Sequence, residues 1–438
     1  MITTHQNGAT ITVMLAARAI NPLSRLFQRE LAALIDKLEA QRQQLSGVIL
    51  GFDAETAGSD HELEHLMALT PAQAGDCMHM LGAYNALLRR LETLGLPVIA
   101  TLSGAVAGHA LGLVLACHRR ISMVDASYSL PQVHLGLTPV AGEIVRSVRL
   151  LGLQAAMPLL VEGATLDATQ ALRLGLIHAV AEDHNHAAQL AGAAIASQAV
   201  QPWEAKGFQL PGGALGSAPV QAMLQVAPAM LRARTGGHAP APEAVLCAMV
   251  EGLQVDFDSA LLIESRYFCR TAINPVARKL MRLSQLRADA ASPGALDFAA
   301  ALDAALADEI KALREEGVPE ALLRNATRAA GLPPSAIGAG MAARKPAARR
   351  ETEGATAPAL DDIRDRLLYA MVIAALRGVA RGTPASRDEA DLVSVRACGF
   401  PAHTGGALRF IRHSGKDTFA GRAAALGPRF ALPPGWDA

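Results

Sequence analysis

The sequence predicts an α/β domain followed by helical regions, and three observations support this fold class. Short apolar runs that suit buried strands lie at 10–16, 45–52 and 97–102. Stretches with helical spacing, 22–45 and 74–95, alternate with these runs along the chain. Strands that alternate with helices of this length favour a parallel sheet covered by helices.

The rest of the chain is predicted to be mainly helical. Helical spacing covers 180–237, with an interruption at 211–213, and then 241–285. After residue 287, alanine-rich helices give way to a small, charged and unpatterned stretch around 338–356, which is typical of a linker. A final helix is predicted to begin near Asp361, where two successive aspartates suit the positive end of the helix dipole.

These patterns divide the chain into three expected domains. The first is the α/β domain, over 1–190, and the second is a helical extension with a connecting helix, over 191–290. The third is a helical module over 291–438, with a mobile linker near 335–360. A chain of 438 residues is long enough for two or three domains with a sizeable core.

Composition narrows the class of protein. Half of the residues (51%) are hydrophobic and only 18% are charged, which favours a folded chain over a disordered one. Lysine and arginine together number 40, as do aspartate and glutamate, so charge gives no reason to expect a nucleic-acid or membrane-surface partner. No apolar run approaches the ~18 residues of a membrane span. The first residues lack the pattern of a signal peptide.

The five cysteines indicate the redox compartment of the protein. They lie far apart, without CxxC pairs or a histidine spacing typical of zinc. An odd number of scattered thiols fits a reducing compartment. We therefore expect a cytoplasmic protein without a metal site.

The stretch 102–132 carries the most specific pattern. Gly104, Gly108 and Gly112 mark a glycine-rich turn that leads into an apolar helix, and a Pro131-Gln132 turn follows about twenty residues later. In this arrangement the segment resembles the crotonase (enoyl-CoA hydratase/isomerase) superfamily. The resemblance implies a ββα spiral core that binds acyl-CoA thioesters, as in fatty-acid β-oxidation, with coenzyme A entering as part of the ligand and no separate cofactor.

The two catalytic glutamates of that family are replaced here. In the family the glycine-rich run ends in glutamate and the later turn reads Pro-Glu, whereas this chain has Gly112 and Gln132 at those positions. Glycine offers no side chain, and glutamine does not titrate. Because acid–base groups each contribute ~10² to 10⁴-fold to such reactions, hydration at a useful rate is not expected by the family's mechanism.

A wider resemblance covers the order of motifs along the chain. The segments 21–24, 57–60, 255–268, 365–369 and 398–406 resemble the bacterial multifunctional fatty-acid oxidation α-subunit, which fuses a crotonase domain to a 3-hydroxyacyl-CoA dehydrogenase. The module 291–438 is similar to the C-terminal domain of that dehydrogenase. No GxGxxG turn occurs between 287 and 361, and about seventy residues are too few for the NAD-binding domain. Hydride transfer is therefore not expected.

The resemblance also assigns binding roles. Two backbone N–H groups, at Ser59 and His109, would stabilise the oxyanion of a thioester enolate. Arg18 and Arg25, which flank the motif at 19–24, would contact coenzyme A. Solvated helix arginines are the alternative for both.

Three other side chains are candidate bases. Glu143 lies at a predicted helix N-terminus, where the family usually has glycine; helix capping or surface solvation would also explain a carboxylate there. The His109 imidazole could enter the pocket or only pack beside it. His134 follows Gln132 by two residues and could point the same way, or could be an ordinary surface or buried histidine.

Three functions follow from these observations. The first hypothesis is a non-catalytic, acyl-CoA-binding pseudoenzyme that serves as a subunit beside a thiolase or another β-oxidation enzyme, in a homo- or hetero-oligomer. The alternative is an active enoyl-CoA isomerase or weak hydratase that uses Glu143 or a histidine, since a double-bond shift needs one base rather than two. A purely structural protein would not bind coenzyme A at all.

Overall fold

The computed structural model describes residues 1–52, 60–286, 294–337, 358–384 and 386–436. The chain forms two compact units, the first made of 1–232 and 240–278 and the second of 233–239 and 279–438. The three-domain division predicted from the sequence stays a prediction.

The first unit is built on a six-stranded sheet. All neighbouring strands are parallel except the first pair, which is antiparallel. The three strands predicted from apolar runs are confirmed. In sheet order the strands are β1 (Ile2–Asn7), β2 (Thr10–Leu15), β3 (Gly47–Phe52), β4 (Val98–Leu102), β6 (Arg119–Met123) and β9 (Ala179–Ala181).

Three of these strands, β1, β6 and β9, differ from the sequence prediction. The edge strand β1 has a polar sequence and is mostly exposed, so it lacks the apolar pattern by which the other strands are found. The predicted helical stretch 180–237 is wrong at its start, because Ala179–Ala181 pair with β6 as β9, and it is wrong over 196–217, which contain no α-helix. Three residues of Ala-Val-Ala are too short for local spacing to separate strand from helix.

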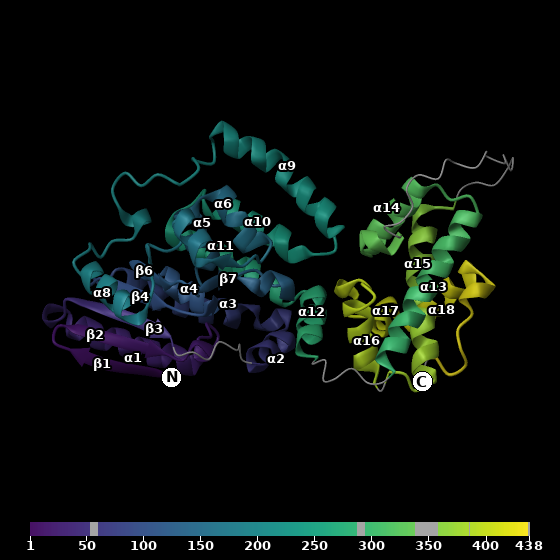
Figure 1. The fold of residues 1–438 in the computed structure, drawn as a ribbon, viewed down its shortest axis with the longest axis horizontal. Coiled ribbons are helices and arrows are strands. Elements are labelled where there is room, and N and C mark those ends of the chain that lie inside the picture. Colours follow the sequence, from purple (N-terminus) through teal and green to yellow (C-terminus); the bar gives the residue numbers. More distant parts are fainter. Residues whose placement is uncertain (53–59, 287–293, 338–357, 385, 437–438) are drawn as a thin grey trace. The chain divides into compact units, whose positions relative to one another are not determined.

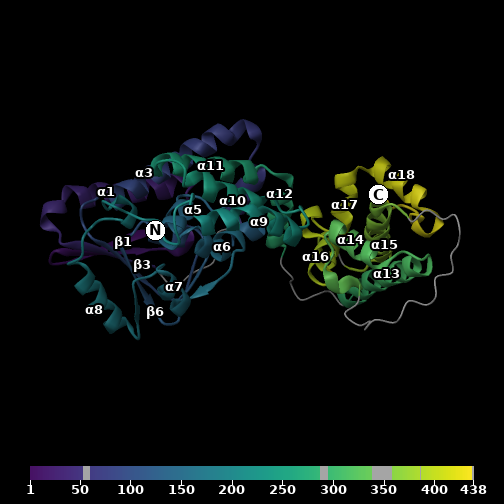
Figure 2. The ribbon, with the colours of Figure 1, turned by 90° about the horizontal axis from the view of Figure 1, so that it is seen from above.

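Helices cover both faces of the sheet. Helix α1 (Arg25–Ala40) begins where the Ser24 hydroxyl accepts a hydrogen bond from the Phe27 N–H, and it buries one apolar face. Figure 2 shows α1 and α3 (Ala74–Glu92) on one side of the sheet and α8 (His184–Ala194) on the other. Helix α8 packs its alanines against Ile99 and Ile121 of the sheet.

A small second sheet and short helices follow β4 and carry the site. The strands β5 (Ala105–Ala107), β7 (Ser127–Ser129) and β8 (Leu166–Asp167) form this sheet. Between and after them lie the helical elements α4 (His109–Leu115), the 3-10 turn η4 (Pro131–Leu135), α5 (Glu143–Leu151), α6 (Leu153–Val161) and α7 (Ala168–Leu174).

Two further helices of this unit, α10 (Pro240–Gly252) and α11 (Phe257–Ala272), pack against α5. Helix α11 packs against both α3 and α5, and α10 packs against α5, α6 and α11 (Figure 1). The unit also contains α2 (Asp60–Ala68) and most of α9 (Ala218–Thr235), while α12 (Pro275–Gln285) begins in this unit and continues into the second one, which includes Arg282.

The second unit is helical throughout the residues that the structure describes. Helix α15 begins at Leu360, one residue before the predicted Asp361, and supplies the largest share of the buried core. The predicted linker at 338–356 lies outside the described residues. No helix in the described part of the chain is both long and apolar enough to cross a membrane. The helices are α13 (Ala295–Glu315), α14 (Glu320–Ala330), α15 (Leu360–Ala380), α16 (Arg387–Arg396), α17 (Ala407–Ser414) and α18 (Lys416–Leu426).

Candidate functional site

The glycine-rich turn places the start of α4 at the centre of the site. The Gly108 N–H donates to the Ser129 carbonyl at 3.0 Å, which ties the turn to β7. Gly108 has a φ of 54°, a left-handed conformation that favours glycine. His109 is the first residue of α4, so its backbone N–H lies among the amides that face out of the helix N-terminus. Ser59, the other predicted oxyanion donor, lies outside the described residues.

The carboxylate of Glu143 lies directly against Gly112. A Cβ atom placed on Gly112 would come within 2.8 Å of Glu143 Cγ and 2.9 Å of its Oε1. The Glu143 side chain therefore occupies the space beside the position where the resemblance expects a glutamate on α4. The carboxylate comes instead from the first residue of α5, a different element.

Both oxygens of Glu143 have partners. Oε1 lies 2.8 Å from His109 Nδ1, and Oε2 accepts from Gln132 Nε2 at 2.7 Å and from the Val140 N–H at 3.0 Å. The Glu143 side chain is fully buried, whereas the His109 side chain is 12% exposed. The surface-solvation alternative for Glu143 is wrong, because the side chain is directed inward by the void at Gly112.

Gln132 contributes a second polar group at the same point. Its Nε2 donates to Glu143, while its Oε1 is buried without a hydrogen-bond partner among the described residues. A Cβ on Gly108 would lie 3.6 Å from Gln132 Nε2, so the amide also borders the oxyanion turn. A buried acceptor without a donor is unfavourable, and a water or ligand hydroxyl at this place would satisfy it.

Burial and the charge of Glu143 affect the pKa of Tyr84 on α3. Burial raises the pKa of Tyr84 above its usual value, and the charge of Glu143 raises it further. The hydroxyl is buried without a hydrogen-bond partner among the described residues. It therefore stays protonated and can donate a hydrogen bond to a ligand or water.

Glu264 on α11 holds the start of α5. Its carboxylate accepts from the Gly142 N–H at 2.6 Å and the Val145 N–H at 2.9 Å. These amides belong to the N-terminal turn of α5, which has no intrahelical acceptors for them. Burial raises the pKa of Glu264 to about 8, opposed by the Val145 N–H and reinforced by the charge of Glu143.

A buried ion pair fixes the turn just before α5. Arg146 Nε lies 2.6 Å from Glu92 Oε1, and both side chains are fully buried. Arg146 also donates to the Ala141 carbonyl at 3.1 Å, and Ala141 has the unusual φ of 65°. Any side chain on Gly142 would collide with the Arg146 guanidinium, so glycine is required there. Strained backbone held by its surroundings in this way is characteristic of functional sites.

Of the predicted site residues, the structure brings together His109, Gly112, Gln132 and Glu143. His134 is exposed and its ring lies against Gly163. Residues 131–135 form a 3-10 turn, so side chains two apart do not share a face as they would on a strand. This placement does not support a role for the His134 side chain in the site.

The two arginines predicted to contact coenzyme A are both exposed. Arg18 lies in the short 3-10 turn Ala17–Ala19. Arg25, the first residue of α1, lines a surface groove of about 620 Å³ together with Gln28, Arg29 and Leu87 of α3. Each remains a candidate for coenzyme A.

Sequence reasoning missed Glu264, Glu92 and Arg146. Glu264 lies 122 residues from Gly142 along the chain, and Glu92 lies 54 residues from Arg146. No local spacing signals either pairing. The one available signal is that a glutamate and an arginine fall on otherwise apolar helix faces, which indicates buried partners.

A known protein family matches most of the first unit in sequence. Residues 5–201 match the model of the family "Enoyl-CoA hydratase/isomerase". For residues 5–201 this match supports the crotonase part of the resemblance and agrees with the α/β core, while the likeness to the multifunctional α-subunit stays a prediction.

Several solved structures are also similar. An enoyl-CoA hydratase/carnithine racemase from Magnetospirillum magneticum is 27% identical, with 44% of this chain and 72% of that chain covered and a TM-score of 0.38. An enoyl-CoA hydratase from Bacillus halodurans is 16% identical, with 64% and 98% covered and a TM-score of 0.44. One from Bacillus anthracis is 22% identical, with 61% and 89% covered and a TM-score of 0.39.

Proposed function

Because residues 5–201 match the enoyl-CoA hydratase/isomerase family, we propose that this region binds an acyl-CoA thioester and moves a proton on its acyl chain, as an enoyl-CoA isomerase does. The observation that carries the proposal is the pair formed by His109 and Glu143, 2.8 Å apart, beside the oxyanion turn. A carboxylate is present at the site although both family positions for one, Gly112 and Gln132, lack it.

The proposed reaction needs one base. The imidazole of His109 removes a proton from C2 of a 3-enoyl thioester, and the electron pair moves onto the thioester oxygen to give a dienolate. The backbone N–H of His109 donates to that oxygen, and a second donor from the segment containing Ser59 would complete the oxyanion hole. The proton then returns to C4, the double bond lies between C2 and C3, and the thioester carbonyl reforms.

Glu143 acts through His109 in this scheme. Its carboxylate orients the ring through Nδ1 and supplies the negative charge that stabilises the imidazolium while it holds the proton. Full burial of the Glu143 side chain strengthens this interaction, because its carboxylate is shielded from water. Gln132 and the Val140 N–H fix the other carboxylate oxygen, so the acid cannot rotate away from the ring.

For the coenzyme A part of the ligand we propose Arg25, with Arg18 as a second contact. The groove beside Arg25 also contains Arg29, and guanidinium groups suit phosphate binding. This assignment rests on the family resemblance and on the groove.

A second candidate function is supported by one observation. Glu143 is fully buried with both oxygens occupied, an arrangement that also suits a structural carboxylate. In that case the region binds acyl-CoA without turnover and serves as a non-catalytic subunit, for example beside a thiolase.

One experiment separates the two functions. Wild-type protein is titrated with crotonyl-CoA by calorimetry and assayed for conversion of 3-hexenoyl-CoA to the conjugated 2-enoyl thioester by absorbance. We expect binding and turnover in the wild type. In Glu143→Gln we expect kcat to fall by ~10²-fold or more, with KM little changed, because charge on the base's partner is lost.

The exposed Glu182 provides the matched control. Glu182→Gln removes the same charge from the surface of the first unit and should leave kcat unchanged. Binding without turnover in the wild type would favour the non-catalytic subunit. Absence of binding would exclude both functions.

A further inference from the structure

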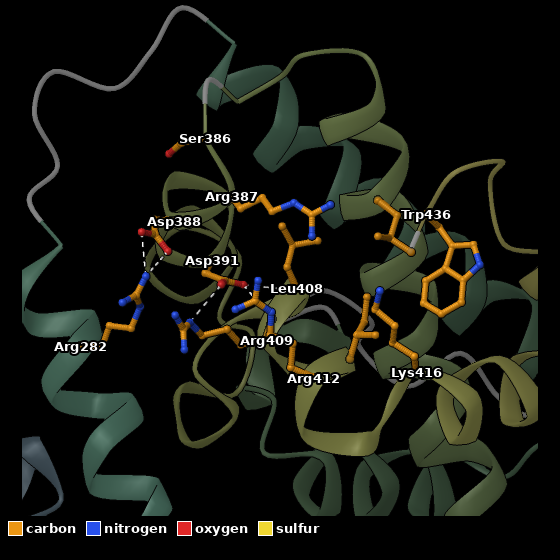
Figure 3. A pocket seen from close by; sticks show the side chains of 12 residues that line it. Arg282, Ser386, Arg387, Asp388, Asp391, Leu408, Arg409, Arg412, Lys416 and Trp436 are labelled. Atoms are coloured by element: carbon orange, nitrogen blue, oxygen red, sulfur yellow. Dashed lines mark hydrogen bonds and ion pairs between the residues drawn. The ribbon is translucent and has the colours of Figure 1, made fainter. Parts of the chain in front are cut away.

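A cavity in the second unit has no role in the proposed chemistry. It has a volume of about 490 Å³ and lies between the starts of α16 and α18, one side of α17, and Trp436 near the end of the chain. Figure 3 shows Arg387 of α16 and Arg412 of α17 reaching into the same space, with Lys416 and Trp436 at its far side. Cavities of this size suit small-molecule ligands.

The lining of this cavity is strongly basic. Five basic side chains line it but only two acidic ones, so the lining set carries a net charge of +3. Such a concave basic surface attracts anions. The basic residues are Arg282, Arg387, Arg409, Arg412 and Lys416, and the acidic residues are Asp388 and Asp391.

The two acids are already engaged by the protein. Asp388 lies 2.6 Å from the Arg282 guanidinium. The buried Asp391 accepts from the Leu408 N–H at 2.8 Å and lies 3.7 Å from Arg409 Nε. These carboxylates therefore organise the wall of the cavity and leave an excess of positive charge on it.

The helix ends at the cavity are also capped from within. The Ser386 hydroxyl accepts from the Glu389 N–H at the start of α16. At the start of α17, the Asp391 carboxylate accepts from the Leu408 N–H. An anion here would thus be held by side-chain cations rather than by helix N-termini. Crowding of the cations supports this: burial lowers the pKa of Arg409, and the charge of Arg282 lowers it further.

The rest of the lining is apolar and contains one aromatic ring. Leu376, Leu408 and Ile411 are buried at the cavity. Trp436 is only half-buried and packs on Phe419, with ring centroids 5.8 Å apart. The indole is thereby anchored at the edge of a basic cavity, where a planar ring of a ligand could stack on it.

We infer that this cavity binds a nucleoside phosphate, whose phosphate groups contact Arg387, Arg412 and Lys416 and whose base stacks on Trp436. Arginine forms paired hydrogen bonds to phosphate oxygens, and base–indole stacking contributes affinity with little base preference. The site is separate from the thioester site and does not depend on the proposed isomerase activity.

The chain offers a direct probe. It has two tryptophans, and Trp203→Phe leaves Trp436 as the sole indole. In that background we expect ADP to quench the fluorescence in a saturable way. ADP should bind more tightly than pyrophosphate, which lacks the base, and far more tightly than adenosine, which lacks the phosphates. Raising the salt concentration should weaken ADP binding, because the attraction is electrostatic.

Variants test which side chains hold the ligand. Arg412→Ala and Arg387→Ala should each weaken ADP binding roughly tenfold, a typical effect of losing one charge-assisted contact. Arg396→Ala, at the exposed opposite end of α16, is the matched control and should bind as the parent does. The inference is overturned if ADP does not quench, or if Arg396→Ala weakens binding as much as Arg412→Ala. Pyrophosphate binding as tight as ADP would overturn the assignment of a nucleoside.

Discussion

At the scale of single residues, the space beside Gly112 determines what the site contains. Glycine at this position leaves room for the Glu143 side chain, which reaches across from α5. The two positions are therefore coupled: a side chain at 112 and an inward carboxylate at 143 exclude one another. This coupling explains how a chain without either family glutamate still has a buried acid at the site.

Gly112→Ala tests this coupling. The new Cβ would meet Glu143 Cγ at 2.8 Å, so we expect Glu143 to be displaced and stability to fall by ~1–3 kcal/mol, as in other overpacked sites. Enoyl-CoA isomerisation should fall together with stability. Urea unfolding and the isomerase assay measure both effects.

Gly82→Ala is its matched control. Gly82 lies inside α3 of the same unit, and no atom lies within 4 Å of its added Cβ. Alanine should there stabilise the protein by ~0.5–1 kcal/mol, because glycine is unfavourable in a helix interior. An equal loss of stability in both variants would contradict the steric explanation.

At the scale of elements, α5 is positioned by residues distant in sequence. Glu264 of α11 accepts the first amides of α5, and Glu92 of α3 pairs with Arg146. The start of α5, and with it Glu143, is therefore held from two sides. Removing one member of the buried pair, as in Arg146→Met, leaves Arg89, 2.8 Å from Glu92 Oε2, as the partner of the buried acid. We therefore expect a loss of stability smaller than the ~3–5 kcal/mol of a fully unpaired buried charge. Chemical denaturation of this variant and of Arg146→Met/Glu92→Leu, which should recover part of the loss, checks the value.

Glu264 makes the first unit sensitive to pH. Its pKa is raised from 4.5 in the unfolded chain to about 8 in the fold, so the folded state binds the proton more tightly. Its contribution to stability is complete below pH 4.5 and is lost as the pH rises through about 8. The slope from this group is at most ~1.4 kcal/mol per pH unit.

The free energy of unfolding, measured between pH 5 and 8, should therefore fall less steeply in Glu264→Gln than in the wild type. Glu182→Gln, which changes an exposed carboxylate, should keep the wild-type slope. Identical slopes in all three proteins would show that Glu264 does not titrate in this range.

The elements also show how far the sequence predicts this structure. Strands β2, β3 and β4 and helices α1 and α3 have strong apolar periodicity, which depends on local sequence, and each was predicted. Gly112, Gln132 and Glu143 could be singled out because the family pattern fixes their register. Their contact could not be predicted, since it arises only when α5 folds back on α4.

At the scale of the whole molecule, the chain has two units with separate cores. The core of the second unit is formed by α13 to α18, with Phe298 buried against Gly378 of α15. The thioester site is built entirely from the first unit. The two functions proposed for them should therefore be separable by mutation.

Phe298→Ala tests this separation. The variant should destabilise the second unit by ~3–5 kcal/mol, as for other buried phenylalanines. Calorimetric unfolding should show the loss, while crotonyl-CoA binding by the first unit stays unchanged. A parallel loss of crotonyl-CoA affinity would show that the units do not act independently.

The proposed function depends on whether the His109–Glu143 pair moves a proton at the carbon next to a thioester. The most direct measurement is exchange of the C2 protons of butyryl-CoA for deuterium in D₂O, followed by mass spectrometry. Butyryl-CoA has no double bond to shift or hydrate, so exchange reports the proton transfer alone. We predict exchange catalysed by the wild type and by Glu182→Gln, and its loss in Glu143→Gln. Binding of butyryl-CoA by the wild type with exchange no faster than in buffer would contradict the claim.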